Sequence, residues 1–391
     1  MVPDELAVHL AVTHSDVGKQ VLDPFCGSGR LLMAAAARGA ECVGFDINPL
    51  ACLLTEAKSA RVCATSIAEI TAEASRRPVA KGKAQPIILR GNRQVAWYSD
   101  QVAVELQQIL RWINSLGLGG SERLVVAAAL SAAARDSSWC RKNGWKLHRL
   151  SVNARESHRR SAWTSFVTRL QYYVNNAESI PLKGTVGVTN RSITALATGG
   201  EILINDAQYD LILTSPPYGD SKTTVQYGAA SALCLDVVSR ISGLESFYAD
   251  GSNIDSKCLG SRRRDLEHRE IDFRKYWPGD RENEAHGRVQ LFLDDFAIGC
   301  EAMDRLLKPG GVAILIVGRR CAGGLRLDLD RFAIDKFGQQ GIKIVASDTR
   351  SLVTKRLPKQ INRYARSRSD DRRKLGTIQT MSEEIVLTFR K

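Results

Sequence analysis

Two short segments contain residue types that can bind a nucleoside and hold an amine. The first is Asp23-Pro24-Phe25-Cys26-Gly27-Ser28-Gly29, with an expected strand before it and an expected helix after it. Glycine lets the backbone turn sharply and approach a ligand, and the free N–H groups at a helix start suit a ligand carboxylate. Asp46 ends the next expected strand, where a carboxylate can accept both hydroxyls of a ribose. A ligand-free glycine turn is the alternative for the first segment taken alone.

The second segment, Thr214-Ser215-Pro216-Pro217-Tyr218-Gly219, follows an apolar strand expected over Asp210–Thr214. Its two prolines fix the backbone and lack N–H groups, which leaves nearby carbonyls free as acceptors. The Ser215 hydroxyl adds a side-chain acceptor, so the segment can hold both hydrogens of a planar exocyclic amino group. Tyr218 provides a ring face on which a flipped base can stack. A proline-rich turn is the structural alternative, but the segment lies where α/β sheets bind their ligands.

The elements that must position these segments are an alternating series of strands and helices. Strands are expected over Gln20–Asp23, Glu41–Phe45, Gly184–Val188, Asp210–Thr214, Val312–Val317, Ile342–Ser347 and Glu384–Phe389. Helices are expected over Arg30–Arg38, Pro49–Ala60, Leu291–Leu307 and Leu327–Phe337, with a helix stop and turn at Lys308-Pro309-Gly310-Gly311. This order predicts a doubly wound α/β sheet with helices on both faces.

A long polar block interrupts this alternation between the second and third strands. Residues 62–183 have a mostly helical pattern, with helices expected over Asp100–Leu116 and Ser121–Ala134. We interpret the chain as a first part of one domain (residues 1–61), a helical insertion (62–183) and the second part of the same domain (184–391). The insertion is one candidate for a recognition region, and residues 243–290 are another.

Composition excludes several classes of protein. The chain has 391 residues, of which 44% are hydrophobic and 25% charged, as in globular proteins. Its longest apolar runs, 31–37 and 124–134, are shorter than the ~20 residues that span a bilayer. The acidic start lacks the basic residues of a secretory signal. Nine scattered cysteines without C-x-x-C spacing favour reduced thiols in a cytoplasm, and neither they nor the dispersed histidines predict a metal site.

The basic excess, a formal charge of +13, favours a polyanionic partner such as nucleic acid. Residues 135–169 contain nine basic and two acidic side chains with three interleaved tryptophans, and residues 350–374 contain ten basic and two acidic ones. We expect both clusters to bind phosphates, with a solvated surface as the alternative for each. From the second cluster we select as DNA-binding candidates Arg350, Lys355, Arg356, Lys359 and Arg363.

Both segments resemble motifs of the DNA amino-methyltransferases, which methylate exocyclic amines of DNA bases with S-adenosylmethionine. DPFCGSG (residues 23–29) resembles their cofactor loop, and TSPPY (214–218) contains SPPY (215–218), which resembles their catalytic tetrapeptide. The string GDSKTTVQYG (219–228) is similar to the continuation in a branch that acts on cytosine N4, where serine is the usual first residue of the tetrapeptide. The resemblance covers residues 2–60 and roughly 185–391.

The resemblance implies a Rossmann-like fold with seven strands, the last one antiparallel. It also implies S-adenosylmethionine as cofactor, bound by residues 23–29, Asp46, Ile47 and Asn190, and catalysis by Ser215, Pro216, Pro217 and Tyr218 without a metal. The substrate would be double-stranded DNA from which a cytosine is flipped. The chain departs from the family at Arg30, where many relatives have threonine, and at Asn190, where an acid often contacts adenine.

A restriction–modification system in a bacterial or archaeal cytoplasm, near the nucleoid and with a cognate restriction endonuclease, is the setting that the resemblance implies. Three other interpretations of the sequence remain open. One is methylation of adenine N6, one is methylation of guanine N2 in RNA, and one is a nucleic-acid-binding scaffold that has kept the fold without catalysis.

Overall fold

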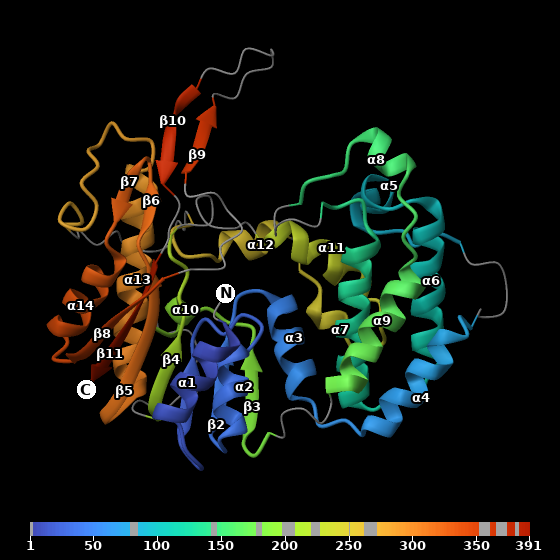
Figure 1. Ribbon diagram of the computed structural model, residues 1–391, viewed down its shortest axis with the longest axis horizontal. Coiled ribbons are helices and arrows are strands. Elements are labelled where there is room, and N and C mark those ends of the chain that lie inside the picture. The colour runs from blue at the N-terminus through green and yellow to red at the C-terminus, as the bar shows by residue number, and fades with distance from the viewer. Residues whose placement is uncertain are drawn as a thin grey trace.

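The structure is a computed structural model that describes residues 3–78, 85–141, 147–176, 182–197, 208–219, 227–249, 251–261, 272–351, 360–364, 374–379 and 383–391. It consists of an α/β unit and, to the right in Figure 1, a lobe of helices. Among the helices that it describes, none is long and apolar enough to cross a membrane.

The secondary structure follows the expected alternation. The strands are β1 (Gln20–Asp23), β2 (Glu41–Phe45), β3 (Thr185–Thr189), β4 (Tyr209–Thr214), β5 (Leu307–Gly318), β6 (Arg320–Ala322), β7 (Leu325–Leu327), β8 (Lys343–Ser351), β9 (Gln360–Tyr364), β10 (Lys374–Gln379) and β11 (Glu383–Arg390). The helices are α1 (Asp4–His14), α2 (Arg30–Ala37), α3 (Pro49–Ser59), α4 (Ala64–Ser75), α5 (Arg93–Trp97), α6 (Asp100–Ser115), α7 (Gly120–Ser137), α8 (Val152–Glu156), α9 (Ala162–Asn176), α10 (Ile193–Ala197), α11 (Gly228–Val238), α12 (Gly251–Ser256), α13 (His286–Leu306) and α14 (Leu329–Gln339).

A seven-stranded sheet organises the α/β unit, in the order β3-β2-β1-β4-β5-β11-β8. Strands β3, β2, β1, β4 and β5 pair in parallel, and β11 pairs antiparallel with both β5 and β8. The predicted fold class, including the antiparallel last strand, is therefore confirmed. The strand order reverses between β1 and β4, and doubly wound sheets bind ligands at the carboxyl ends of the strands at such a point.

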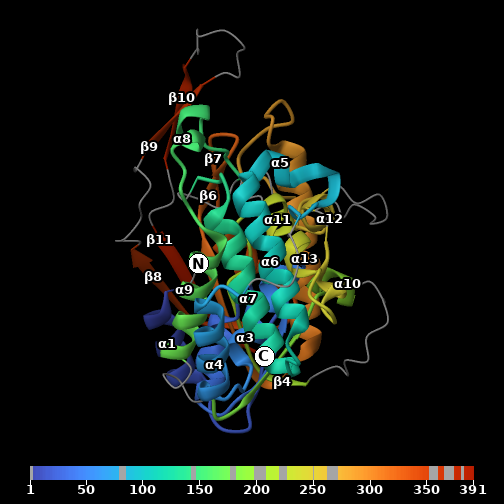
Figure 2. The same ribbon diagram turned by 90° about the vertical axis from the view of Figure 1, so that its right-hand side faces the viewer.

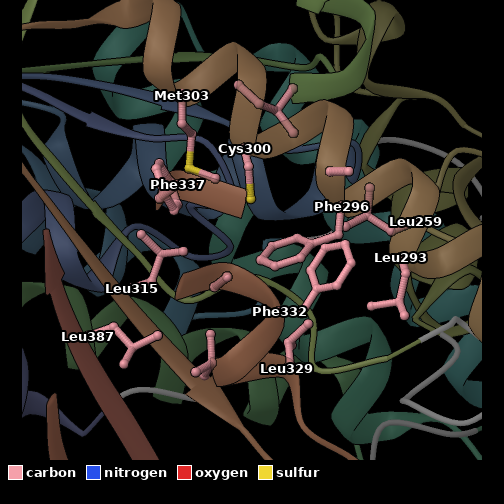
Figure 3. Packing of buried hydrophobic residues seen from close by; sticks show 14 of the residues in the cluster. Leu259, Leu293, Phe296, Cys300, Met303, Leu315, Leu329, Phe332, Phe337 and Leu387 are labelled. Atoms are coloured by element: carbon pink, nitrogen blue, oxygen red, sulfur yellow. The ribbon is translucent and has the colours of Figure 1, made fainter. Parts of the chain in front are cut away.

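Alternating side chains bury the two faces of this sheet. On one face Val21, Leu211 and Ile314 pack with α1 and α2, whereas their neighbours Leu22, Ile212 and Leu315 point to the opposite face. Figure 3 shows that second face, where residues of α13 and α14, among them Phe296 and Phe332, pack toward the sheet. A sheet covered on both faces in this way presents its strand ends as a rigid edge.

The insertion forms the helical lobe with its own apolar core. Trp112, Trp163 and Phe166 are buried together there, with ring centroids 5.9–6.3 Å apart. Helix α3 and the later helices α11 and α12 contribute to the same cluster, through Leu53 and Ile254 for example. The lobe is thus completed by segments outside residues 62–183, which the sequence pattern did not predict.

Residues 243–290 divide between the two units. Leu244 and Ile254 pack in the core of the lobe, whereas Phe273, Trp277 and Val289 belong to the cluster on the sheet. The described parts of this segment therefore connect the lobe to the sheet, and its role as a separate recognition region remains a prediction.

Strand β5 begins earlier than expected. The sequence placed a turn at residues 308–311 and the strand at Val312, but Leu307 already pairs with Tyr209 of β4. The register shifts between Tyr209 and Leu211, so the intervening residues form an irregularity inside the strand. Gly310 has a φ of +77°, and its N–H donates to the Lys391 carbonyl at 2.9 Å. The glycine that predicted a turn serves instead to keep the bulged strand paired.

Candidate active site and a basic groove

The two segments with chemistry follow adjacent strands at the reversal point of the sheet. Val21 and Leu22 of β1 pair with Leu211 and Ile212 of β4, so the loops after Asp23 and Thr214 leave the sheet side by side. Asp23 in turn pairs with Gly44 of β2, which brings Asp46 to the same edge. The sequence-predicted site residues of both segments and Asp46 are thus brought together.

The loop over residues 23–29 needs glycine at two positions. Gly27 and Gly29 have φ values of +52° and +75°, in the left-handed region that side chains rarely adopt. A Cβ on Gly29 would also lie 2.4 Å from Thr55 Cγ2 of α3. The backbone can therefore enter α2 at this sharp angle only because no side chain is present.

Helix α3 holds this loop from the side. Thr55 Oγ1 donates to the Gly27 carbonyl at 3.1 Å, and Lys58 Nζ donates to the Ser28 carbonyl at 2.7 Å. The two residues are three positions apart and therefore lie on one face of the helix. Sequence analysis missed both, and this spacing opposite the loop was the signal that could have found them.

Asp46 is fixed by backbone N–H groups. Its Oδ2 accepts from Gly27 N at 2.9 Å and its Oδ1 from Asn48 N at 2.8 Å. Burial raises the pKa of Asp46 to about 6, against the two backbone hydrogen bonds that lower it. The side chain is only partly buried, and each oxygen accepts a single protein hydrogen bond in these contacts. Its remaining lone pairs fit the two hydroxyls of a ribose.

Asn190 and Ile47 also lie at this edge. The Asn190 side chain donates from Nδ2 to the backbone carbonyl of Asp46 at 2.8 Å, which ties the end of β3 to the end of β2. Ile47 follows Asp46 directly and is partly exposed. Their proposed contacts with a cofactor remain predictions. Asp206, an alternative acid for the same contact, lies outside the described residues.

Asp23 links the two loops from beneath. It is 1% exposed and accepts from Thr214 Oγ1 at 2.6 Å and from Phe25 N at 3.1 Å. Burial raises the pKa of this carboxyl to about 7, and the nearby Asp46 adds to the rise. The hydrogen bond to Thr214 joins the loop over residues 23–29 to the end of β4, which Ser215 follows directly. A buried contact therefore sets the distance between the two loops.

Cys26 packs inside the loop. The side chain is 6% exposed, and burial strongly raises the pKa of its thiol, so it stays protonated. A Cβ on Gly44 would lie 2.9 Å from Cys26 Sγ and 2.6 Å from Leu32 Cδ1. A buried, protonated thiol in this environment packs against its neighbours and is a poor nucleophile. Arg30, where many relatives have threonine, forms an ion pair with Asp4 at 2.7 Å.

The tetrapeptide carries a chain of polar contacts. Ser215 Oγ and the Tyr218 hydroxyl lie 3.1 Å apart, and that hydroxyl donates to Glu384 Oε1 at 3.1 Å. Arg350 Nη2 contacts the other oxygen of Glu384 at 2.6 Å. Burial, followed by the charge of Glu384, raises the pKa of Tyr218 well above its usual value. Sequence analysis missed Glu384, which lies on β11 at the far end of the chain.

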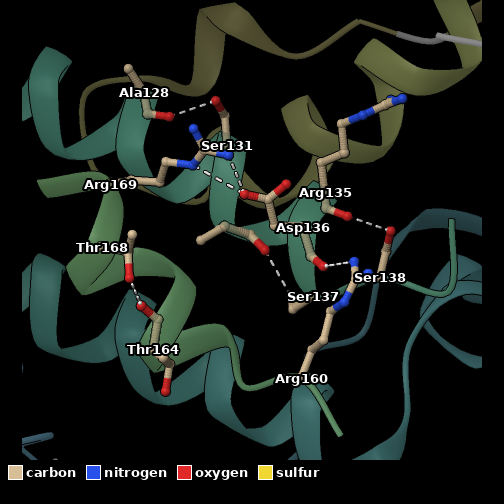
Figure 4. A network of polar contacts seen from close by, with 11 residues as sticks. Ala128, Ser131, Arg135, Asp136, Ser137, Ser138, Arg160, Thr164, Thr168 and Arg169 are labelled. Carbon is tan, nitrogen blue, oxygen red and sulfur yellow. Dashed lines mark hydrogen bonds and ion pairs between the residues drawn. The ribbon is translucent and has the colours of Figure 1, made fainter. Parts of the chain in front are cut away.

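A second feature is an open groove on the helical lobe. Figure 4 shows its centre, where Arg169 contacts Asp136 and Arg160 donates to the Asp136 carbonyl at 2.6 Å. Hydroxyl groups of Ser161, Thr164 and Thr168 line the same groove. Its arginines come from the end of α7, the segments before and after α8, and α9, and they are Arg135, Arg141, Arg159, Arg160 and Arg169. Five of the nine basic residues in the first predicted cluster therefore line one concave surface.

The second basic cluster is described only in part. Lys355, Arg356 and Lys359 lie outside the described residues, and Arg363 belongs to β9, which forms an antiparallel hairpin with β10. In Figures 1 and 2 this hairpin and α8 both lie at the top of the molecule, on the side of the carboxyl ends of the parallel strands. DNA binding by these residues remains a prediction, and Arg350 is engaged by Glu384 next to the tetrapeptide.

Among the described residues, no group of three or more histidine, cysteine, aspartate or glutamate side chains has an arrangement that could hold a metal ion.

Comparison with known proteins finds similarity to enzymes of DNA methylation. A family model described as DNA methylase matches residues 1–57. The type II methyltransferase M.MvaI of Kocuria varians is 23% identical over 95% of this chain and 84% of its own length. The type II methyltransferase M.MjaII of Methanocaldococcus jannaschii is 37% identical, but over only 14% of this chain and 10% of that protein.

Solved structures add little beyond the topology. A SAM-dependent methyltransferase from Methanosarcina mazei covers 98% of this chain and 96% of its own, with 9% identity and a TM-score of 0.35. Likeness at that level carries no weight. The family model and M.MvaI, in contrast, both confirm the resemblance to the DNA amino-methyltransferases that the motifs predicted.

Proposed function

We propose that this relative of the DNA amino-methyltransferases transfers a methyl group from S-adenosylmethionine to the N4 amine of a cytosine flipped out of duplex DNA. The observation that carries the proposal is the joining of two loops at one sheet edge. Thr214 Oγ1 donates to the buried Asp23 at 2.6 Å. This bond fixes the distance between the glycine loop (residues 23–29), which would bind the nucleoside, and the tetrapeptide (215–218), which would hold the amine. A reaction between a bound nucleoside and an amine would use both.

The cofactor would be held by the loop and Asp46. A Cβ on Gly27 would meet no atom within 4 Å, which leaves room for a ligand there, and the carboxylate of Asp46 lies at the same edge with lone pairs for a ribose. When bound, S-adenosylmethionine supplies a methyl group whose bond to sulfur breaks, with the electron pair kept by sulfur, as the bond to nitrogen forms. The protein's task is to fix that loop, and Thr55 and Lys58 do so from α3.

The tetrapeptide would hold the acceptor. An aromatic amine is a poor nucleophile because its lone pair is delocalised into the ring. Hydrogen bonds from the two amino hydrogens to Ser215 Oγ and the Pro216 carbonyl favour a more tetrahedral nitrogen with its lone pair outward. Most of the remaining rate comes from holding nitrogen in line with the methyl group. After transfer the nitrogen releases its extra proton to solvent.

Duplex DNA would contact the basic surfaces. A stacked base cannot reach the tetrapeptide, so the enzyme must flip it, which costs a few kcal/mol. Contacts to phosphate offset that cost. The groove with five arginines offers a concave, positively charged surface for a sugar–phosphate backbone, and the β9–β10 hairpin is a second candidate. A restriction endonuclease of the same specificity is the partner that the relatives named above suggest.

Methyl transfer from tritiated S-adenosylmethionine to duplex DNA, single-stranded DNA and RNA tests the proposal. We expect label in duplex DNA and at most traces in RNA. Preferential labelling of RNA would favour the guanine-N2 alternative. Cofactor binding by calorimetry without labelling of any nucleic acid would favour the non-catalytic scaffold.

A further inference from the structure

We propose that Glu384 is a positioning residue that acts through Tyr218 to make Ser215 a hydrogen-bond acceptor toward the substrate amine. The inference rests on the proposed function for its reaction, but it concerns a contact that the two sequence motifs do not contain. It assigns a direction to the hydrogen bonds that link β11 to the tetrapeptide.

Glu384 lies at the centre of a buried polar contact. It sits on β11, between Gly318 of β5 and Arg350 of β8 in the sheet register, and is only 3% exposed. Its Oε2 pairs with Arg350 Nη2 at 2.6 Å, while its Oε1 lies 3.1 Å from the Tyr218 hydroxyl. Arg350 therefore supplies the counter-charge that a buried carboxylate requires.

The carboxylate dictates which way the protons point. An ionised carboxylate can only accept hydrogen bonds, and a tyrosine hydroxyl has one proton to donate. Tyr218 must therefore direct its proton to Glu384, and burial keeps that proton in place by raising the pKa of the phenol. In the 3.1 Å contact between Ser215 and Tyr218 the donor must then be Ser215.

The consequence appears at Ser215. Because its single proton is directed to the Tyr218 oxygen, Ser215 Oγ has only lone pairs left for a ligand. An amino group of a base is a donor and would be received there without competition. A serine free to rotate would aim its proton at the amine for part of the time. The contact chain thus gives a neutral serine the acceptor-only character that an aspartate has by charge.

Glu384→Gln tests the direction, because Arg350 also fixes how the new amide must lie. Arg350 is a donor, so the amide oxygen turns to it and the amide NH₂ turns to Tyr218. The phenol then accepts from that NH₂ group and donates to Ser215, whose proton is driven toward the amine. We expect kcat to fall about 10- to 100-fold, as for a lost charge-assisted hydrogen bond. Glu383→Gln, at the exposed neighbouring residue, is the matched control and should leave kcat unchanged.

Two further variants separate this role from a structural one. Adding Arg350→Met to Glu384→Gln frees the amide to turn its oxygen to Tyr218, so kcat should recover several-fold. In a Tyr218→Phe background the hydrogen bonds from Glu384 to Ser215 through the phenol are already lost. Glu384→Gln should therefore cause no further fall in kcat there. Cofactor affinity measured by calorimetry should stay within about twofold throughout, since none of these residues belongs to the cofactor loop.

The outcomes distinguish this inference from the proposed function. A wild-type protein that methylates no nucleic acid would sink the proposed function itself. An active wild type whose kcat falls equally on Glu384→Gln in the native and Tyr218→Phe backgrounds would overturn the positioning role alone. If Glu384→Gln fails to fold, Tyr218→Phe still tests the chain, because it leaves the Glu384–Arg350 pair intact. It must lower kcat, though by less than Glu384→Gln would, since the freed serine aims its proton at the amine only part of the time.

Discussion

The edge of the sheet and the groove of the helical lobe differ in the kinds of group that they present to the ligands proposed for them. At the edge, function depends on backbone turns and on polar side chains that are already hydrogen-bonded, such as Asp23 to Thr214 and Asp46 to Gly27. In the groove, it depends on long cationic side chains that surround a single acid, Asp136. The edge therefore suits a ligand of which a few atoms must be fixed, whereas the groove suits the repeating charge of a polyanion, as the proposed function requires.

This difference follows from what each ligand demands. Methyl transfer needs an in-line geometry, and small displacements of the reacting atoms are costly in rate. A phosphate backbone repeats its charge and tolerates sliding, so affinity comes from counterion release more than from exact contacts. We therefore expect variants at the edge to change kcat or cofactor affinity, and variants in the groove to change DNA affinity alone.

The largest effect should come from Tyr218→Ala at the edge. This change removes both the ring that stacks on a base and the hydroxyl that orients Ser215. The rate of methyl transfer should fall about 100- to 1,000-fold, because the free energies of a stacking contact and a hydrogen bond are both lost. S-adenosylmethionine affinity should not change. Single-turnover kinetics and calorimetry measure the two, and unchanged turnover would remove Tyr218 from the chemistry.

The next effect concerns pH and cofactor affinity. Burial raises the pKa of Asp46 to about 6, so the ionised form that accepts ribose hydroxyls predominates only above that pH. Affinity for S-adenosylmethionine should therefore rise as pH rises, by about tenfold between pH 5 and 7 for one titrating group. Asp46→Asn should flatten this profile. Asp23, with a pKa of about 7, would add a smaller coupled step that survives in the variant.

If the groove holds DNA, its exposed arginines set the salt dependence. The double variant Arg141→Gln/Arg159→Gln should weaken duplex binding roughly fivefold and reduce the salt slope by about two. Fluorescence anisotropy over a salt series measures both, with the exposed Arg111→Gln on α6 as control. The kcat of the double variant at saturating DNA should equal that of the wild type. A fall in kcat without a change in DNA affinity would contradict the expectation that the groove affects DNA binding alone.

The smallest effect should arise where α3 supports the cofactor loop. Thr55→Val removes the hydrogen bond to the Gly27 carbonyl but keeps the shape of the side chain. We expect a two- to fivefold loss of S-adenosylmethionine affinity, of the order of one neutral hydrogen bond. Thr65→Val, an exposed threonine on α4, is the control. Equal affinities for both variants would mean that the loop holds its shape without α3.

Local signals predicted the sheet edge well. The bounds of β1 and β2 follow from short apolar runs that end at a loop or an acid, and the glycine loop and TSPPY are contiguous in sequence. The bulge in β5 was missed because Lys308-Pro309-Gly310-Gly311 has the composition of a turn, and only pairing with β4 and the C-terminal strand keeps it extended.

Contacts between residues far apart in the chain could not be predicted from the sequence. Glu384 and Tyr218 are 166 residues apart, and neither residue type nor spacing indicates that they meet. Likewise, nothing local indicates that Ile254 completes the core of the lobe begun by α4–α9. The charge clusters were visible in the sequence, but the gathering of five arginines of the first cluster into one groove depends on the packing of α7 against α9.

Mass spectrometry of nucleosides from duplex DNA incubated with the protein and S-adenosylmethionine tests the central claim most directly. The account predicts N4-methylcytosine with the wild-type protein and none above background with Ser215→Ala. N6-methyladenine in its place would overturn the assignment of the base, and the absence of any methylated nucleoside from a protein that binds both S-adenosylmethionine and DNA would contradict the account.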